Sequence, residues 1–299
     1  MKIIRDLNLE QPPCVITIGN FDGIHLGHQA LLAEVKKRAD YLSINSVVMT
    51  FEPNPKDFFS QNKTQSRISS LREKIEFFDK VKIDRAHIIK FNKQFSQLTA
   101  KDFIKILIEN LKVKEIVVGE DFSFGKRREG SLKELSESGI RLNIQKKVMI
   151  NNQRISSTSI RELLTHDKLE EANLFIGRPY SISGKVIHGQ KRGREIGFPT
   201  ANIHMRHNRP PLKGVFAVKS GNYFGVANIG FRPTFEGDNK LHLEVHFLNF
   251  SSNLYGQHIS VNFLRKIRDE MKFSSLEDLK KQIQKDINKT KLFFKNLDS

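Results

Sequence analysis

The stretch Gly19-Asn20-Phe21-Asp22-Gly23-Ile24-His25-Leu26-Gly27-His28 decides how the first half of this 299-residue chain folds. It follows the apolar run Val15–Ile18 and precedes the helical stretch Gln29–Ala39, so it predicts a strand, a tight turn and a helix N-terminus. Glycines let the backbone turn and approach a ligand closely. The N–H groups and the positive dipole end of such a helix attract phosphate, and His25 and His28 would donate to the same anion. The stretch therefore predicts a nucleotide site.

The same stretch resembles the HxGH signature of adenylyl and cytidylyl transferases. Its longer form, GNFDGxHxGH, is similar to the N-terminal module of bacterial bifunctional riboflavin kinase/FAD synthetases. The resemblance implies that His25 and His28 are catalytic. It also implies that the surrounding turn binds nucleotide through Gly19, Phe21, Asp22, Gly23 and Gly27. Asp22 has a second reading, as a side chain that stabilises the turn, and both readings stay open.

Length and composition bound what the rest of the chain can be. At about 100–200 residues per domain, 299 residues are enough for two domains, and 38% hydrophobic residues supply a core for both. The one cysteine, Cys14, cannot form an internal disulfide, and Met1–Pro13 has no apolar stretch of the signal-peptide type. Since no window approaches the roughly 18 apolar residues of a membrane span, we expect a soluble cytoplasmic protein with no membrane partner.

The formal charge of +17 has two readings, because a basic chain binds nucleic acid electrostatically or uses lysine to solvate its surface. The basic residues are scattered, and no run is longer than Lys126-Arg127-Arg128. Tryptophan is absent and tyrosine is scarce. We therefore favour a solvated surface and anionic substrates over a nucleic-acid partner.

The first half of the chain alternates apolar strands with helical patterns. Four short runs are typical of strands: Val15–Ile18, Ser46–Phe51, Ala86–Ile89 and Glu115–Val118. The clearest helix has an apolar stripe from Phe103 to Leu111, with Thr99 as its N-cap and Asp102 three residues on. Strands separated by helices predict a Rossmann-like α/β domain with a parallel sheet. The HxGH turn then lies at the carboxyl end of the first strand, where such sheets bind ligands.

Near Gly177–Pro179 the pattern of strands separated by helices gives way to short alternating runs. This change predicts one domain over residues 1–177 and another over residues 178–299. Five short alternating runs follow: Tyr180–Ile187, Gly214–Val218, Tyr223–Ile229, Leu241–Phe247 and His258–Phe263. Their spacing favours an antiparallel β-barrel. A terminal helix, started by Ser275 and Asp278, would pack on the barrel. Its apolar stripe consists of Leu276, Leu279, Ile283 and Ile287.

A second segment of the first domain, residues 154–161, reads Arg-Ile-Ser-Ser-Thr-Ser-Ile-Arg and places hydroxyls at an expected helix start. Ser159 and Glu162 have capping-box spacing, so a capped helix is the plain reading. Beside the HxGH turn, the hydroxyls, the free N–H groups and Arg161 also make an anion site. The segment is similar to the ISSTxxR signature of the same family. The resemblance implies that Ser156, Ser157 and Thr158 bind nucleotide and that Arg161 acts in catalysis by holding the leaving pyrophosphate.

The segment from Val118 to Gly130 resembles the flavin-nucleotide side of the same site, although by itself it also reads as a glycine-rich loop with solvated charges. The resemblance implies that Asp121 and Arg128 bind flavin. Two positions depart from the family's pattern. Ser131 stands where Asp is frequent, and Asn54 stands where His is common, which leaves the contribution of residue 54 open.

The second domain carries its own glycine-rich, basic stretch from Gly184 to Asn202. Its backbone N–H groups and basic side chains suit phosphate, yet it lacks the GxxxxGK[ST] order of a P-loop. It resembles the flavokinase motif, whose Pro-Thr-Ala-Asn end holds magnesium and ATP. The resemblance implies that Thr200 and Asn202 are Mg2+ ligands, hard oxygens that suit a hard cation. It implies nucleotide contacts at Gly184, Gly189, Gly193, Arg194 and Thr200.

Glu244 is a carboxylate on an otherwise apolar strand, so we expect burial to raise its pKa toward the range of a general base. A solvent-facing strand residue is the alternative. By the resemblance, Glu244 takes the proton from the riboflavin 5′-hydroxyl, whereas we expect His246 to be structural. The segment Ile267–Phe273 matches the family's closing segment, which implies flavin contacts for Arg268 and Glu270. A charged helix or loop start explains that segment equally well.

These motifs cover nearly the whole chain in the family's order and predict a bifunctional riboflavin kinase and FMN adenylyltransferase. Its ligands would be ATP with Mg2+, riboflavin, FMN and FAD. Three alternatives are a flavokinase whose N-terminal module only binds nucleotide, a nucleotidyltransferase for a lipid or coenzyme precursor, and a basic RNA-binding protein. The intact His25 and His28 argue against the first alternative, and the second has no use for Glu244. Salt-dependent retention on nucleic acid would test the third.

Overall fold

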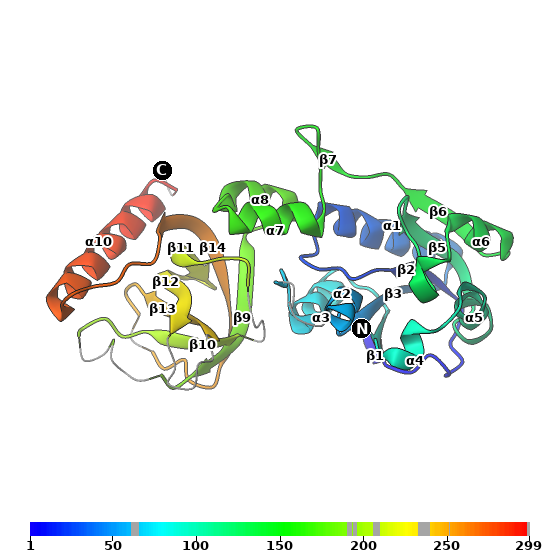
Figure 1. The fold of residues 1–299 in the computed structure, drawn as a ribbon, viewed down its shortest axis with the longest axis horizontal. Helices are drawn as coiled ribbons and strands as arrows, with labels where there is room; N and C mark the ends of the chain where they lie inside the picture. Colours follow the sequence, from blue (N-terminus) through cyan, green and yellow to red (C-terminus); the bar gives the residue numbers. More distant parts are fainter. Residues whose placement is uncertain are drawn as a thin grey trace. The chain divides into compact units, whose positions relative to one another are not determined.

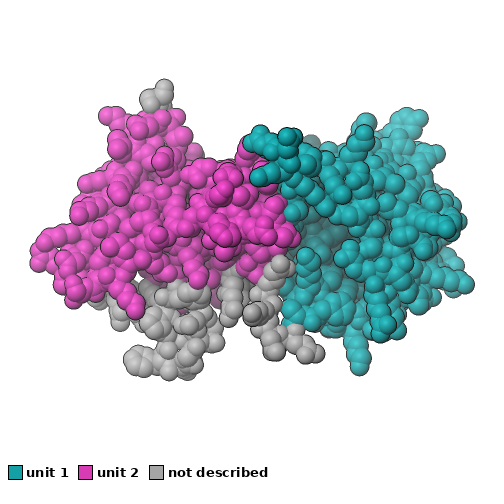
Figure 2. Space-filling view, turned by 45° about the horizontal axis from the view of Figure 1, so that its top comes forward, with its two compact units in different colours: residues 1–65, 69–157 teal, residues 66–68, 158–299 magenta. Residues whose placement is uncertain are grey.

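The computed structural model describes residues 1–60, 66–189, 193, 196–205, 210–232, 240–250 and 252–297. The chain forms two compact units, which Figure 2 colours separately. The first unit comprises residues 1–65 and 69–157, and the second comprises residues 66–68 and 158–299. Among the described residues, no helix is both long and apolar enough to cross a membrane.

The first unit is built on a parallel sheet, as the sequence predicts (Figure 1). The sheet has six strands in the order β1-β4-β3-β2-β5-β6. The strands are β1 (Lys2–Ile4), β2 (Cys14–Ile18), β3 (Asn45–Glu52), β4 (Arg85–Lys90), β5 (Val113–Gly119) and β6 (Arg141–Gln145). The four central strands match the four predicted runs. The two edge strands, β1 and β6, were not predicted, because each has one buried residue or none.

Helices cover both faces of this sheet, and alternate residues of each strand point to opposite sides. Val15 and Val48 pack with Leu32 and Phe78 under α1 and α3. On the other face, Ile16 packs under α5, η1 and α6. The helical elements are α1 (Leu26–Leu42), α2 (Pro55–Phe59), α3 (Leu71–Lys80), α4 (Lys93–Ser96), α5 (Ala100–Lys105), the π-helix η1 (Ile106–Asn110), the 3-10 turn η2 (Lys126–Arg128) and α6 (Leu132–Glu137). A small hairpin joins β7 (Met149–Ile150) to β8 (Gln153–Arg154).

The predicted helix from Thr99 to Leu111 forms, but not as one regular α-helix. Thr99 is its N-cap as predicted, and its Oγ1 accepts a hydrogen bond from the N–H of Asp102 at 3.1 Å. The helix then widens, and the N–H of Leu111 donates to the carbonyl of Ile106 five residues earlier. Because a π-turn changes the angular spacing, Ile108 of the predicted stripe is exposed.

The second unit contains a closed antiparallel barrel in the order β10-β13-β12-β11-β14-β9, which confirms the predicted fold (Figure 1). Its elements are α7 (Ser157–Thr165), α8 (Leu169–Ile176), β9 (Tyr180–Ile187), β10 (Ala201–Met205), β11 (Gly214–Ser220), β12 (Tyr223–Arg232), β13 (Lys240–Phe247), β14 (His258–Arg268) and α10 (Leu276–Lys295). Strand β10 was missed in the sequence. It has one fully buried residue, Ile203, so it shows no apolar run.

The terminal helix α10 packs on β11, β12 and β14. Ser275 is its N-cap, as predicted, and accepts from the N–H of Asp278 at 3.1 Å. The contact face continues through Ile287 to Phe294, whose ring stacks on Phe224 with centroids 4.0 Å apart. Leu276 is 57% exposed, so its place in the predicted stripe is wrong. The first turn of the helix projects beyond the packed face.

The division between the compact units falls at Ser157/Thr158, some twenty residues before the predicted boundary at 177/178. Helix α8 accounts for the difference, because it packs on β9 and β14. The side chain of Asn173 donates to the carbonyl of Phe263 at 3.2 Å and accepts from the N–H of Tyr180 at 2.7 Å. The change in sequence pattern near Gly177 thus marks the start of β9. The boundary at 177/178 stays a prediction about independent folding.

Candidate active sites

The HxGH turn connects the carboxyl end of β2 to the start of α1, as the sequence predicts. Gly19, its first residue, donates its N–H to the carbonyl of Met49 at 3.0 Å. Three residues have left-handed backbone angles: Phe21 (φ 49°), Gly23 (φ 82°) and Ile24 (φ 41°). Non-glycine residues adopt such angles only where the surroundings impose them. Phe21 and Ile24 are both fully buried, and their packing holds the turn.

The two histidines of the turn lie face to face. Their ring centroids are 3.7 Å apart with an interplanar angle of 19°. His25 is the N-cap of α1, and its Nδ1 accepts from the N–H of His28 at 3.3 Å. A side-chain carbon on Gly27 would lie 3.2 Å from the His25 ring, so glycine permits this approach. The structure thereby brings the predicted catalytic pair together at a helix N-terminus.

His28 is held in its neutral form. Burial lowers its pKa well below the usual value, and the nearby His25 and Lys74 lower it further. Its Nδ1 is buried and accepts no hydrogen bond from any described residue. A neutral imidazole carries one N–H donor. His28 can therefore donate a hydrogen bond to an anion without carrying a full positive charge.

Asp22 is buried, with 4% of its surface exposed. Its Oδ1 accepts from the N–H of Ser69 at 3.0 Å, and the Ser69 hydroxyl accepts from the N–H of Gly23 at 2.6 Å. These bonds fit the turn-stabilising reading of Asp22. Its carbonyl accepts from the Ser157 hydroxyl at 2.8 Å, which brings the predicted Ser156–Ser157 segment to the turn.

Thr158 and Arg161 belong to α7 of the second unit. The Nε of Arg161 donates to the carbonyl of Ser66 at 2.6 Å. Helix α7 begins at Ser157, so its N-cap position is Ser156, and the predicted capping box at Ser159 and Glu162 is wrong by three residues.

Sequence analysis missed a cluster of phenylalanines at the carboxyl side of the sheet. Phe51 lies in β3, Phe91 directly follows β4, and Phe122 and Phe124 follow β5. Neighbouring ring centroids lie 5.2–6.2 Å apart along Phe51, Phe58, Phe59, Phe91, Phe95, Phe103, Phe122 and Phe124. Phe59 is 63% exposed. Such surfaces suit a planar aromatic ligand.

The two predicted flavin residues of the first unit lie in the loop after β5, and both are exposed. Asp121 pairs with Arg154 of β8, whose hydrogen bond lowers the pKa of that carboxyl. Arg128 donates through Nε to the Ser123 hydroxyl at 2.7 Å. The two departures from the family pattern are both helix caps. Asn54 accepts from Lys56 N at 3.0 Å, and Ser131 caps α6 in a capping box.

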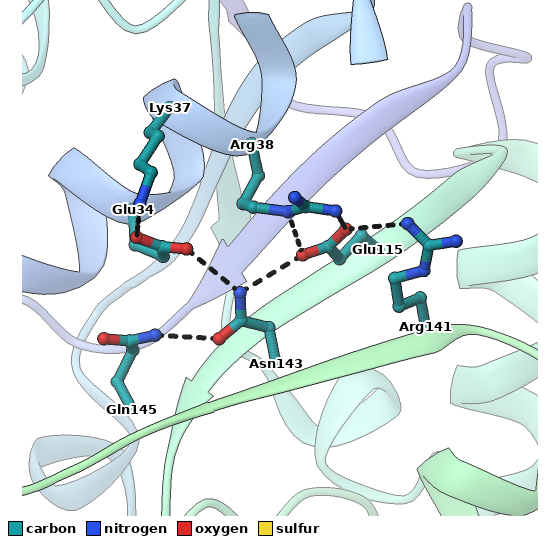
Figure 3. A network of polar contacts seen from close by, with 7 residues as sticks. All are labelled: Glu34, Lys37, Arg38, Glu115, Arg141, Asn143 and Gln145. Atoms are coloured by element: carbon teal, nitrogen blue, oxygen red, sulfur yellow. Dashed lines mark hydrogen bonds and ion pairs between the residues drawn. The ribbon is translucent and has the colours of Figure 1, made fainter. Parts of the chain in front are cut away.

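A polar network fixes α1 against the sheet (Figure 3). Glu115 of β5 receives two hydrogen bonds of 2.7 Å from Arg38 of α1 and one of 3.2 Å from Asn143 of β6. Burial would raise the pKa of Glu115, but these donors hold it below its usual range. Arg141 adds a second cation 3.8 Å away. The network anchors the helix whose first turn carries His28, and nothing in the HxGH motif points to it.

In the second unit, glycines lie directly against the side chains of the Pro-Thr-Ala-Asn segment. A side-chain carbon on Gly189 would clash with the Asn202 amide, and one on Gly193 would lie 3.2 Å from Thr200 Oγ1. Gly193 also accepts from the N–H of Phe198 at 2.7 Å. Arg194 lies outside the described residues. Gly184 sits within β9 where strand β10 passes closely, so a side chain there would clash with its carbonyl backbone.

Glu244 lies on the outer face of the barrel. Its neighbours Leu243 and Val245 point inward, and Glu244 is half-buried, so the expectation of a buried carboxylate is wrong. It stands directly opposite Asn202 of β10 and Asn228 of β12 in the strand register. Opposite residues share a face and lie close together. His246, two residues on, bonds through Nδ1 to the carbonyl of Pro199 at 2.8 Å, which supports a structural role.

The closing segment places its two predicted flavin residues differently. Glu270 is exposed, and its carboxylate lies so close to Gly230 that a side chain there would overlap it. Gly230 is two residues from Asn228 on β12, on the face that carries Glu244. The guanidinium of Arg268 is turned to Asp286 of α10 instead, with Nη2 2.8 Å from Oδ2.

Comparisons with known proteins match the two halves of the chain to two different families. The family model for FAD synthetase matches residues 7–159, and the model for riboflavin kinase matches residues 176–294. The bifunctional riboflavin kinase/FMN adenylyltransferase of Haemophilus influenzae is 44% identical, over 98% of this chain and 99% of that protein. The chain belongs to the bifunctional riboflavin kinase/FMN adenylyltransferase family. A relative of the same name from Escherichia coli is 42% identical over 98% of each chain.

The fold of this family member also has a close solved counterpart. A crystal structure described as a macrolide-efflux protein from Streptococcus pneumoniae is 30% identical and superposes with a TM-score of 0.85. The match covers 97% of this chain and 99% of that one. The FAD synthetase match contains the histidine pair, and the riboflavin kinase match contains the row formed by Asn202, Glu244 and Asn228. The histidine pair and the Glu244 row of this family member thus lie in different units.

The described residues contain no group of three or more His, Cys, Asp or Glu side chains that could hold a metal ion. Thr200 and Asn202 fit a Mg2+ carried by a nucleotide, because their oxygens are hard and the glycine backbone leaves room beside them. Neutral ligands of this kind bring no negative charge to the Mg2+. The phosphates themselves would provide most of the ligands, as is usual for Mg2+ at nucleotide sites.

Proposed function

We propose that this enzyme makes FAD in two steps. The second unit transfers the γ-phosphoryl group of ATP to riboflavin, which gives FMN. The first unit transfers the adenylyl group of a second ATP to FMN and releases pyrophosphate. One observation supports the proposal: the histidine pair lies in the FAD synthetase match, and Glu244 with its neighbours Asn202 and Asn228 lies in the riboflavin kinase match.

The adenylyl step needs no protein nucleophile, because the FMN phosphate attacks the α-phosphorus itself. Catalysis then depends on alignment and on donors directed at the oxygens that gain charge. His25 and His28 at the N-terminus of α1 would serve as these donors, and the lowered pKa of His28 suits a neutral donor. Ser156, Ser157, Thr158 and Arg161 would hold the leaving pyrophosphate. The phenylalanine cluster, with Asp121 and Arg128 in the loop after β5, would receive the flavin ring and its tail.

The kinase step needs a base and an aligned phosphate. Glu244 would take the proton from the riboflavin 5′-hydroxyl as that oxygen attacks the γ-phosphorus. Glu244 is half-buried and lies opposite Asn202 in the strand register, which supports this role because Asn202 belongs to the segment proposed to hold nucleotide. Thr200 and Asn202 would hold a Mg2+ that neutralises phosphate charge. The glycine backbone at Gly189 and Gly193 would lie along the phosphates, and Glu270 would face the flavin.

A chromatographic assay tests both steps at once. Purified full-length protein is incubated with riboflavin, ATP and Mg2+, and the flavins are separated over time; FMN should appear first and FAD second. A parallel reaction starts from FMN, and a third contains a chelator. FMN as the end product would support the flavokinase alternative with a non-catalytic first unit. No conversion of either flavin would refute the proposal. We also expect the protein in the cytoplasm, which fractionation of the source cells would test.

A further inference from the structure

The guanidinium of Arg268 makes its described contacts inside its own unit. Its Nε donates to both carboxylate oxygens of Asp286 at 3.0 and 2.9 Å, and its Nη1 donates to the carbonyl of Asp269 at 2.8 Å. Asp286 is 2% exposed and also accepts from Gln282 at 2.8 Å. With Nη2 also on Asp286, all three nitrogens are engaged. Arg268 therefore holds the chain and leaves little capacity for a ligand.

A second ion pair fixes the same segment. The Nζ of Lys266 lies 2.5 Å from the carboxylates of both Asp167 and Asp269. Between these two anchors, β14 skips Ile267 in its pairing with β11. Such bulges bend a strand and redirect the side chains that follow, often beside active sites. The turn after β14 is thus held on one side by the α7–α8 connection and on the other by α10.

Glu270 comes directly after this held turn. Its carboxylate lies over Gly230 of β12, where any side chain would overlap it. Gly230 and Asn228 share one face of β12, and Asn228 stands opposite Glu244. The orientation of the turn therefore determines where a second carboxylate lies on the face that carries the proposed base.

We propose that Asp286 is a positioning residue of the riboflavin site. Through its two-oxygen bond to Arg268 it fixes the turn that places Glu270 over Gly230, and Glu270, not Arg268, faces the flavin. The inference rests on the proposed kinase function. It assigns α10 a part in substrate recognition although Asp286 acts only through Arg268.

A double-mutant cycle in the full-length enzyme tests the proposal. Asp286→Asn, Arg268→Gln and the double variant are each assayed for riboflavin kcat/KM, for the KM of ATP and for adenylylation of supplied FMN. Each should lower riboflavin kcat/KM by about 10- to 100-fold, the scale of a misplacement of about 1 Å. The double variant should lose no more riboflavin kcat/KM than either single variant, because each of the three variants breaks the same Arg268–Asp286 ion pair. The KM of ATP and FMN adenylylation should stay within about twofold.

Direct contact of Arg268 with flavin gives another pattern, in which Arg268→Gln loses far more activity than Asp286→Asn; that result would overturn the proposal. Should a single variant fail to fold, the double variant still decides, because it leaves no uncompensated buried charge. Asp278→Asn is the matched control, since its carboxylate accepts from the Ser275 hydroxyl at 2.7 Å at the start of the same helix and makes no described contact with Arg268. Kinetics of Asp286→Asn equal to those of this control would also overturn the proposal.

Gly230→Ala is an independent variant, because it displaces Glu270 without touching the Arg268–Asp286 pair. It should reproduce the loss in riboflavin kcat/KM with the KM of ATP unchanged, and an unchanged riboflavin kcat/KM would show that the place of Glu270 does not matter. These outcomes are distinct from a failure of the proposed function. In that case the unmodified enzyme itself would form no FMN from riboflavin.

Discussion

The two units build their candidate sites in different ways. In the adenylyltransferase unit, ten consecutive residues supply the turn, the helix N-terminus and both histidines, and buried Phe21 and Ile24 hold the turn in place. In the kinase unit, the row of Asn202, Glu244 and Asn228 comes from three different strands and is aligned by the barrel register. A local site is therefore readable from one motif. A site assembled across strands depends on every pairing between them.

The largest effect should come from Glu244, the proposed kinase base. Glu244→Gln keeps the size and polarity of the side chain but cannot accept a proton, so riboflavin phosphorylation should fall by about 10²–10⁴-fold. Adenylylation of supplied FMN should be unchanged, and the exposed Glu277→Gln on α10 serves as control. If both activities fell while circular dichroism showed an intact fold, the separation of the two sites would be wrong.

The corresponding experiment on the first unit tests the proposed role of His28 in the HxGH turn. His28→Ala removes a donor to transition-state charge, and FAD formation should fall by about 10²–10³-fold. FMN should accumulate from riboflavin at the normal rate. The exposed His166→Ala is the control. FAD formation from supplied FMN at an undiminished rate would contradict the role given to the histidine pair.

What could be predicted from the sequence follows the same division. Strand β9 was predicted at its observed bounds, and the caps at Thr99 and Ser275 form the predicted hydrogen bonds, because each depends on residues a few positions apart. The half-exposed place of Glu244 depends on which face of a barrel the strand presents. Arg268 can bind either a ligand or Asp286. Which of the two it binds depends on helix α10, because Asp286 lies 18 residues later in the chain. No local pattern contains that information.

The phenylalanine cluster and the Glu115 network were missed for a related reason. The rings come from five segments that meet only at the carboxyl side of the sheet, and a single phenylalanine in a sequence does not indicate whether it lies in a core or in a site. Glu115 looks like an exposed residue at the start of an apolar run. Its partner Arg38 lies 77 positions earlier. Acidic residues inside predicted buried strands are the signal that could have found it, since a buried charge needs a partner.

Removing helices α7 and α8 should sharpen the comparison at the level of stability. The fragment 158–299 retains α8 on β9 and β14, whereas the fragment 178–299 lacks both helices and exposes the barrel surface on which the α8 residues Leu169, Phe175 and Ile176 are buried. Each large buried side chain contributes about 1.5–3 kcal/mol, so the shorter fragment should unfold with at least about 3 kcal/mol less free energy. Urea unfolding and riboflavin phosphorylation of both fragments measure this. Equal stability would show that the predicted boundary at 177/178 is sufficient.

The smallest effect concerns acid sensitivity of the first unit. His87 of β4 is 1% exposed, and burial, aided by the nearby Arg85, lowers its pKa to about 4. The unfolded chain has a histidine pKa of about 6.5, so it binds the proton more readily than the folded chain does. The neutral ring therefore contributes stability that is present above pH of about 6.5 and is lost as the pH falls toward 4. The contribution is on the order of 1–3 kcal/mol.

This effect should appear in one activity and not in the other. Enzyme heated at pH 5 or at pH 7 and then assayed at neutral pH should lose adenylylation sooner after the acidic treatment. His87→Gln has no titrating ring, so it should narrow the difference in loss of adenylylation between heating at pH 5 and heating at pH 7. The half-life of the variant's adenylylation activity on heating at pH 7 serves as the reference. Phosphorylation should show less dependence on the pH of heating, because His87 belongs to the other unit. An equal acid dependence of both activities, unchanged in the variant, would mean that groups other than His87 govern the loss.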